Sequence, residues 1–317
     1  MNFLVTGANG FVGRTLCADL VQHGHIVRAA IRSDKAWLVG VDNVEVGDLN
    51  ALTDWSAALK NIDVVVHVAA RVHVMQDTSS DPLAEFRQVN VVATENLARQ
   101  AAAAGVKRLV YVSSIKVNGE GTLGLTRYTE QDTPNPQDPY GVSKWEAEQT
   151  LQRIAAETGL EVVVVRPPLI YGAGVMGNFI SLFSVIERGI PLPLKGADNA
   201  RSLLYIGNFV DALRVCATHP SAVGQTYLVS DGEAISTATL VEKIAQALGC
   251  RNPAFYFSPN ILRALAGMLG RTSVIDRLFG SLRINDQKIR DELGWQPPYT
   301  LEQGLLATAD WYRLFRR

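Results

Sequence analysis

The sequence predicts an α/β fold in which helices cover both faces of a parallel sheet, followed by a smaller second domain. Short runs rich in β-branched residues alternate with amphipathic stretches over the first two-thirds of the chain, as expected of a sheet built from strand–helix–strand units. With 317 residues and 47% hydrophobic content, the chain can bury one large core and a second, smaller one. After Arg166, prolines and glycines interrupt the pattern.

The expected strands are short apolar runs, each too short to be a helix, and each followed by a turn or a helical pattern. They cover residues 3–6, 26–31, 44–46, 64–69, 109–113 and 162–166. The expected helices cover residues 11–23, 55–59, 83–104 and 140–158. This order predicts a doubly wound, Rossmann-type sheet.

The domain boundary is expected directly after Arg166, where Pro167-Pro168 begins the interrupted segment. Residues 1–166 would form the Rossmann domain, and residues 167–317 a smaller mixed α/β substrate domain. A helix over 206–218 is expected to pack back onto the first domain. Another is expected over 237–248, with Ser236 as its N-cap.

Composition narrows the class of protein. The formal charge is −1, and no block of like charges is present, so neither nucleic acid nor a membrane surface is expected as a partner. Apolar runs fall short of the roughly 20 residues of a spanning helix, and since Met1 leads straight into a strand pattern, no signal peptide is expected. Cys17, Cys216 and Cys250 form no CxxC pair, which argues against a metal site and favours a cytoplasmic protein.

A glycine-rich turn follows the first strand and opens the first helix. Gly7 would permit a tight turn, Gly10 would let the backbone approach a pyrophosphate, and Gly13 would let the helix pack closely on the strand. The N–H groups of the helix N-terminus would then bind the phosphates of a dinucleotide. The residues expected to line this cofactor are Gly7, Asn9, Gly10, Phe11, Val12 and Gly13.

The end of the second strand selects between NAD and NADP. An NAD enzyme places an acid there on the ribose 2′-hydroxyl, and an NADP enzyme an arginine on the phosphate. Here the strand ends in Ile31 and is followed by Arg32, whose guanidinium can bind a phosphate in a bidentate fork. NADP(H) is therefore favoured. NAD(H), with Asp34 on the ribose, is the alternative.

Further motifs follow the later strands in order. They are Gly47-Asp48-Leu49, His67-Val68-Ala69-Ala70, Asn90, Val112-Ser113-Ser114 and Tyr140-Gly141-Val142-Ser143-Lys144. With the glycine turn, this series resembles the extended short-chain dehydrogenase/reductases, a group that includes nucleotide-sugar 4-epimerases, 4,6-dehydratases and 4-keto-sugar reductases. The resemblance extends from Gly7 to about Trp295.

The resemblance implies that Ser114, Tyr140 and Lys144 are catalytic. Tyr140 and Lys144 are four residues apart at the start of a helix and share one face. A tyrosine with an ordinary pKa near 10 is a poor base at neutral pH. Positive charge from Lys144 and an oxidised nicotinamide would lower that pKa. Ser114 would hydrogen-bond the reacting oxygen, and His67, within an apolar strand, is expected to be a core histidine.

The resemblance also implies further ligand contacts. Asn178 and Arg201 would bind the diphosphate of a UDP-sugar, with Arg277 or Arg283 as a second arginine. Asn90 would organise the site. The other expected cofactor contacts are Asp48, Leu49, Ala69, Ala70, Arg71, Tyr140, Lys144 and Pro167, and the other expected substrate contacts are Ser114, Asn118 and Tyr140.

The reaction is narrowed by departures from the family pattern. Dehydratases of the family carry an Asp-Glu pair after the active hydroxyl, where this chain has Ile115-Lys116, so 4,6-dehydration is excluded. Arg32 and the missing acid at the end of the second strand favour an NADPH-dependent reductase. The segments 115–119, 166–169 and 201–203 resemble family members from O-antigen biosynthesis, and this resemblance implies a UDP-4-keto-6-deoxy-N-acetylhexosamine as the substrate. A UDP-hexose 4-epimerase with retained NAD is the first alternative, and a non-catalytic NADP-binding sensor is the second. The family also implies a homodimer.

Overall fold

The structure is a computed structural model that describes residues 1–33, 40–72, 81–258, 261–262 and 279–315. Asp34 and Arg277 lie outside the described residues. In the described part of the chain, no helix is long and apolar enough to cross a membrane.

The main sheet has seven parallel strands in the order β3-β2-β1-β4-β5-β6-β9. The strands are β1 (Asn2–Thr6), β2 (Ile26–Ile31), β3 (Asp42–Glu45), β4 (Val64–His67), β5 (Arg108–Val112), β6 (Glu161–Arg166) and β9 (Thr226–Leu228). This confirms the predicted fold class and all six expected strands, with ends that differ by up to two residues.

Strand β9 was not predicted. It has three residues, too few for a periodic pattern, and it exists because its backbone pairs with Val164, Val165 and Arg166 of β6. A strand of this length is defined by its neighbour and not by its own sequence.

Alternation along the strands builds two cores, one on each face of the sheet. In β4, Val64 and Val66 enter one core and Val65 enters the other; in β6, Val163 and Val165 oppose Val162 and Val164 in the same way. Successive side chains of a strand point to opposite faces, so continuous valine runs supply both cores at once.

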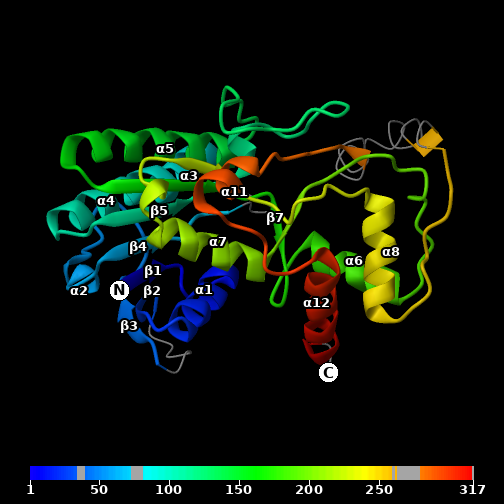
Figure 1. The fold of residues 1–317 in the computed structure, drawn as a ribbon, viewed down its shortest axis with the longest axis horizontal. Helices are drawn as coiled ribbons and strands as arrows, with labels where there is room; N and C mark the ends of the chain where they lie inside the picture. Colours follow the sequence, from blue (N-terminus) through cyan, green and yellow to red (C-terminus); the bar gives the residue numbers. More distant parts are fainter. Residues whose placement is uncertain (34–39, 73–80, 259–260, 263–278, 316–317) are drawn as a thin grey trace.

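Helices from distant parts of the chain cover these faces (Figure 1). On one face lie α1 (Phe11–Gln22), α7 (Ile206–Thr218) and α11 (Gln287–Leu293). On the other lie α2 (Ser56–Leu59), α4 (Ala93–Ala103) and α5 (Pro139–Thr158). Helix α7 lies against α1 in the same core.

A third core lies beside the sheet, in the region drawn with α6, α8 and α12 in Figure 1. It is built by α6 (Asn178–Glu187), α8 (Thr237–Leu248), α12 (Leu301–Phe315) and the two-stranded sheet of β7 (Leu169–Tyr171) and β8 (Leu203–Tyr205). Ser236 caps α8 as expected, because its Oγ accepts a hydrogen bond from the Thr239 N–H at 3.0 Å. After Arg166 the chain crosses between the cores more than once, since α7 and α11 return to the core of the main sheet. A single domain boundary directly after Arg166 remains a prediction.

The expected helix over 83–104 is interrupted. The structure has α3 (Pro82–Arg87), a π-helical turn at Gln88–Val92, and then α4. Turns of this kind are often found at functional sites, and this one carries Asn90.

Candidate active site

The candidate site lies at the carboxyl ends of β1, β4, β5 and β6. The strands are parallel, so the segments that follow them emerge at one edge of the sheet, where open α/β sheets bind ligands. The glycine turn follows β1, Ala69 follows β4 and Ser114 follows β5. Pro167 follows β6, and its carbonyl accepts a hydrogen bond from the Ile115 N–H at 3.0 Å.

The glycine turn has no room for side chains at two positions. Gly7 has a φ of +63°, and a Cβ there would lie 2.9 Å from the backbone of Ala69. A Cβ on Gly13 would lie 2.2 Å from the Gly7 carbonyl oxygen. At Gly10 the sole close neighbour would be the Gly7 carbonyl oxygen at 3.1 Å. The turn therefore packs tightly on the protein side and stays open at Gly10.

The N-terminus of α1 is free to bind an anion. Gly10 is its N-cap, and no side chain caps the helix. The first N–H groups of a helix lack partners within it, and the helix dipole favours negative charge beside them. This uncapped end, with the space above Gly10, fits the pyrophosphate of a dinucleotide.

Arg32 and Asp48, both expected at the cofactor, contact one another. Arg32 Nε lies 3.1 Å from Asp48 Oδ1, and both side chains are largely exposed. An exposed ion pair of this kind contributes at most about 1 kcal/mol, so Arg32 can exchange this partner for a phosphate at little cost. Leu49 is half-buried against the core below.

Asn90 fixes the segment after β4 to helix α5. Its Oδ1 accepts the Arg71 N–H at 2.8 Å, and its Nδ2 donates to the Arg71 carbonyl at 3.0 Å and to Ser143 Oγ at 3.0 Å. Ser143 in turn donates to the Tyr140 carbonyl at 2.8 Å. Through the π-helical turn, Asn90 thus organises the cofactor segment and the Tyr140 turn together.

Helix α5 begins at the site. Its N-cap, Asp138, accepts the Gly141 N–H at 2.6 Å and forms an ion pair with Lys116. Ser114 is buried and caps the short helix Ile115–Val117 by accepting the Lys116 N–H at 3.2 Å. Lys116, in a position that dehydratases fill with acid, therefore ties the Ser114 turn to α5.

Tyr140 is a protonated phenol in this state of the protein. Burial raises its pKa to about 12, and a hydrogen bond with Ser114 offsets part of that increase. The ring packs edge-on against Phe86, with centroids 6.0 Å apart. Ser114 and Tyr140, the two predicted partners of one substrate oxygen, thus lie side by side.

Lys144 is nearly fully buried one turn further along α5. Its Nζ lies 4.3 Å from the centroid of the Tyr111 ring, a favourable position for a cation. Burial lowers its pKa to about 7, and the charge of Glu148 opposes that change. A lysine with this pKa changes charge near neutral pH, one helical turn from Tyr140.

His67 is a structural histidine, as the sequence predicts. Its Nδ1 lies 2.7 Å from Thr6 Oγ1 and its Nε2 lies 2.9 Å from Thr94 Oγ1. Burial lowers its pKa to about 3, with Lys144 contributing, so the ring is neutral. Thr6 Oγ1 also accepts the N–H groups of Val68 and Ala69 at 3.2 Å each, which holds the segment after β4 in place.

Asn118, an expected substrate contact, is held by bonds within the protein. Its side chain is buried, its Oδ1 accepts from Arg166 Nη1 at 3.0 Å, and its Nδ2 donates to the Thr129 carbonyl at 2.9 Å. The sequence could not reveal these bonds, because Arg166 and Thr129 reach Asn118 from other strands and loops. A contact with substrate stays a prediction.

Asn178 and Arg201, the expected diphosphate residues, come from the third core. Asn178 is exposed at the first position of α6, after Gly177 with its φ of +69°. Arg201 is largely buried and donates from Nη1 to the Gly280 carbonyl at 3.1 Å. Burial lowers its pKa.

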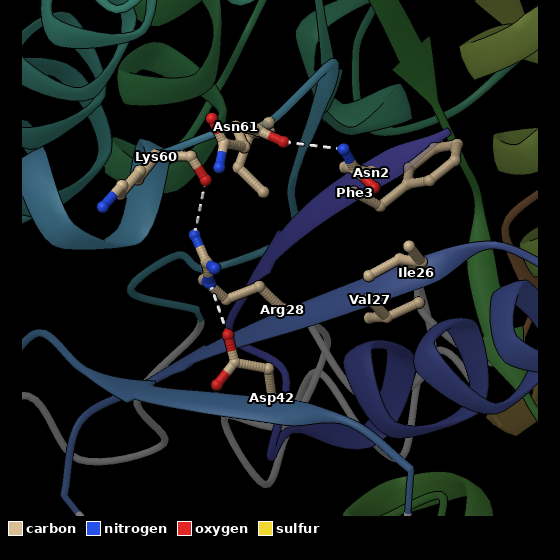
Figure 2. A pocket seen from close by; sticks show the side chains of 9 residues that line it. Asn2, Phe3, Ile26, Val27, Arg28, Asp42, Lys60 and Asn61 are labelled. Carbon is tan, nitrogen blue, oxygen red and sulfur yellow. Dashed lines mark hydrogen bonds and ion pairs between the residues drawn. The ribbon is translucent and has the colours of Figure 1, made fainter.

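A cavity lies at the opposite, amino-terminal edge of the sheet, and residues that line it form hydrogen bonds and ion pairs with one another (Figure 2). Arg28 donates there to Asp42 at 2.7 Å and to the Lys60 carbonyl at 2.8 Å. None of the predicted site residues lines it. In the described part of the chain no cluster of His, Cys, Asp or Glu could hold a metal.

Comparison with known proteins decides the family. Residues 3–230 match the model of the NAD dependent epimerase/dehydratase family. The chain belongs to this family. It is an NAD-dependent enzyme of the nucleotide-sugar epimerase/dehydratase type.

Individual relatives cover nearly the whole chain. A UDP-glucose 4-epimerase of Vibrio cholerae is 43% identical, over 97% of this chain and 94% of its own. A dTDP-glucose 4,6-dehydratase of Haemophilus influenzae is 29% identical over 98% of both. The structure of MoeE5 in complex with UDP-glucose and NAD is similar with a TM-score of 0.79 and 29% identity, over 100% of both chains.

Three residues around Lys144 were missed by the sequence analysis: Tyr111, Glu148 and the guanidinium of Arg166. Glu148 had a signal, since it continues the four-residue spacing of Tyr140 and Lys144 along one helix face. Tyr111 had none, because a tyrosine in an apolar strand is indistinguishable from a core residue.

Proposed function

We propose that this protein is a UDP-hexose 4-epimerase that keeps its NAD through the catalytic cycle. The 43% identity to the Vibrio cholerae UDP-glucose 4-epimerase over nearly both whole chains favours this activity. It places the epimerase ahead of the 4-keto-sugar reductase that Arg32 suggested.

The proposed reaction is an oxidation at C4 followed by reduction on the other face of the sugar. The glycine turn and the N-terminus of α1 would hold NAD, which would supply a nicotinamide able to take up the C4 hydride and return it. Tyr140 takes the proton of the 4-hydroxyl and gives it back, and Ser114 holds that oxygen. No net oxidation of the cofactor results.

Lys144 makes Tyr140 a base at neutral pH. A phenol with a pKa near 12 holds its proton, so positive charge must approach when the ligands bind. The Lys144 ammonium, one helical turn away, supplies this charge. The hydrogen bond of Tyr140 with Ser114, with Lys144 one turn further along α5, is the observation that supports the proposal.

The protein is tested with UDP-glucose and UDP-N-acetylglucosamine without added reductant. We expect the 4-epimers to accumulate to equilibrium, which proton NMR of the sugar would measure. The nicotinamide absorbance should not change over many turnovers. Tyr140→Phe should abolish the reaction. Failure of the wild type to interconvert any UDP-hexose would overturn the epimerase.

The reductase remains a second candidate because of Arg32, whose exposed guanidinium is held by Asp48 alone among the described ionic partners. In this alternative, NADPH reduces the C4 ketone of a UDP-4-keto-6-deoxy-N-acetylhexosamine, and Tyr140 donates the proton. One NADPH would be consumed for each product. Arg32→Asp should then shift the preference from NADPH towards NADH, and an unchanged ratio of kcat/KM values would remove this candidate.

A homodimer in the cytoplasm completes the proposal. Sedimentation equilibrium of the purified protein tests it, and a monomer at all concentrations would contradict it.

A further inference from the structure

A buried ionic network lies directly behind the proposed catalytic residues. Glu148 is fully buried on α5, and Arg166 at the end of β6 binds it through two of its three guanidinium nitrogens. Nε donates to Oε1 at 2.9 Å and Nη2 donates to Oε2 at 2.5 Å. Ser113 donates its hydroxyl to the same carboxylate.

The network joins every element that carries a proposed catalytic residue. Ser113 precedes Ser114 at the end of β5, and Glu148 follows Lys144 by one turn of α5. The third guanidinium nitrogen of Arg166, Nη1, donates to Oδ1 of Asn118, which follows the Ser114 turn. Charge-assisted, bidentate bonds of this kind impose strict geometry.

The groups around Lys144 determine its charge. Lys144 lies over the Tyr111 ring of β5, the charge of Glu148 on its own helix acts on it, and its own charge acts on the neutral His67 of β4. Tyr140 precedes it by one turn of α5. Glu148 is the one carboxylate among these described neighbours. Its charge opposes the effect of burial on Lys144.

We propose that Glu148 and Arg166 are a positioning pair for the reaction: Arg166 fixes Glu148, and Glu148 holds the Ser113-Ser114 turn and serves as the counter-charge of the Lys144 ammonium. This inference rests on the proposed role of Tyr140 and Lys144 in proton transfer. A purely structural ion pair would instead stabilise the fold without acting on Lys144.

Glu148→Gln tests the pair because it keeps the shape and removes the charge. Without its counter-charge, Lys144 should lose its proton at lower pH, and its pKa should fall by at least about one pH unit. This is measured by NMR titration of the protein with ¹³Cε-labelled lysine and no ligand, with Lys144→Met assigning the resonance. An unchanged Lys144 pKa would overturn the proposal, whatever the enzyme's activity.

Kinetics supply the second readout. With Lys144 neutral, the pKa of Tyr140 in the complex rises, so kcat of Glu148→Gln should fall about 10- to 100-fold at pH 7 and recover at higher pH. A uniform loss across the pH range would indicate a structural role alone. If the pKa moves but no UDP-hexose is turned over by the wild type, the proposed function fails and the pair stands.

Two further variants keep the test decisive. Glu161→Gln breaks a second Arg–Glu pair on the same strand β6, formed with Arg108, and should leave both the Lys144 pKa and the pH profile unchanged. Removal of one partner of a buried pair is strongly destabilising. If Glu148→Gln does not fold, the double variant Glu148→Gln with Arg166→Gln removes both buried charges, and the same fall in the Lys144 pKa is expected.

Discussion

The two ends of strand β6 carry the same pair of residue types in different surroundings. At its amino end, Glu161 binds Arg108 at 2.7 Å, and Arg108 also caps α7 by donating to the His219 carbonyl at 2.8 Å. At its carboxyl end, Arg166 binds Glu148 one helical turn from Lys144. The first pair fastens a helix to the sheet. The second lies next to Lys144 and the Ser113-Ser114 turn, which include two of the proposed catalytic residues.

The contrast extends to the edges of the sheet. At the amino edge, Arg28 caps the end of α2 and pairs with Asp42 (Figure 2). At the carboxyl edge, the α1 N-terminus has no side-chain cap, and Lys144 lies over the Tyr111 ring. The arginine at the amino edge is thus engaged in structural bonds, whereas the α1 N-terminus at the carboxyl edge has N–H groups that its own helix does not bind.

The largest expected effect separates function from stability at the carboxyl edge. Tyr140→Phe should lower kcat by about 10²- to 10⁴-fold, because the proton acceptor is gone, and should lower the free energy of unfolding by no more than about 1 kcal/mol for the lost Ser114 bond. Turnover of the UDP-sugar and urea denaturation measure the two quantities. Tyr227→Phe is the control: it removes a hydroxyl that donates to Glu292 at 2.9 Å and should cost about 1 kcal/mol of stability with kcat intact.

The glycine turn should respond next. Gly13→Ala places a Cβ 2.2 Å from the Gly7 carbonyl oxygen, so the turn must move. The Kd for NAD, measured by calorimetry, should rise about 100-fold, and stability should fall by about 1–3 kcal/mol. In Gly10→Ala the NAD affinity alone should fall, because the added methyl faces the open side. Equal stability losses in both variants would contradict this account of the turn.

The amino end of β6 should show the converse of Tyr140. Arg108→Met removes the Glu161 pair and leaves the α7 carbonyls without their donor, so stability should fall by about 2 kcal/mol. That cost is limited because Glu161 is partly exposed. kcat should be unchanged at temperatures where the variant is folded. A change in kcat comparable to that of Tyr140→Phe would erase the distinction between the two ends.

A different quantity, the pH dependence of stability, tests His67, a polar group at the carboxyl edge that the fold satisfies completely. Its pKa is about 3 in the folded protein and near 6.5 when unfolded. Between these values the unfolded state binds the extra proton, so this histidine makes stability rise with pH, by up to about 1.4 kcal/mol per pH unit. The difference in unfolding free energy between wild type and His67→Asn is measured from pH 3 to 7. It should increase with pH at this slope.

Much of the site could be read from the chain because its residues are adjacent to strand ends. The glycine turn, Ser114, Tyr140 and Lys144 each follow a strand or open a helix, so local pattern fixes their place. The π-helical turn at Asn90 could not be read, since it depends on bonds to Arg71 and Ser143. The bonds of Asn118 could not be read for the same reason, as its partners lie on other elements.

The sequence by itself determined the parallel sheet, the dinucleotide turn and the i, i+4 pair of Tyr140 and Lys144, because periodicity and spacing are properties of one segment. Tertiary structure alone decided which charges meet: Arg32 with Asp48, Arg166 with Glu148, and Lys144 with the Tyr111 ring. Electrostatic interactions depend on distance and burial, and both arise when segments far apart in the chain pack together.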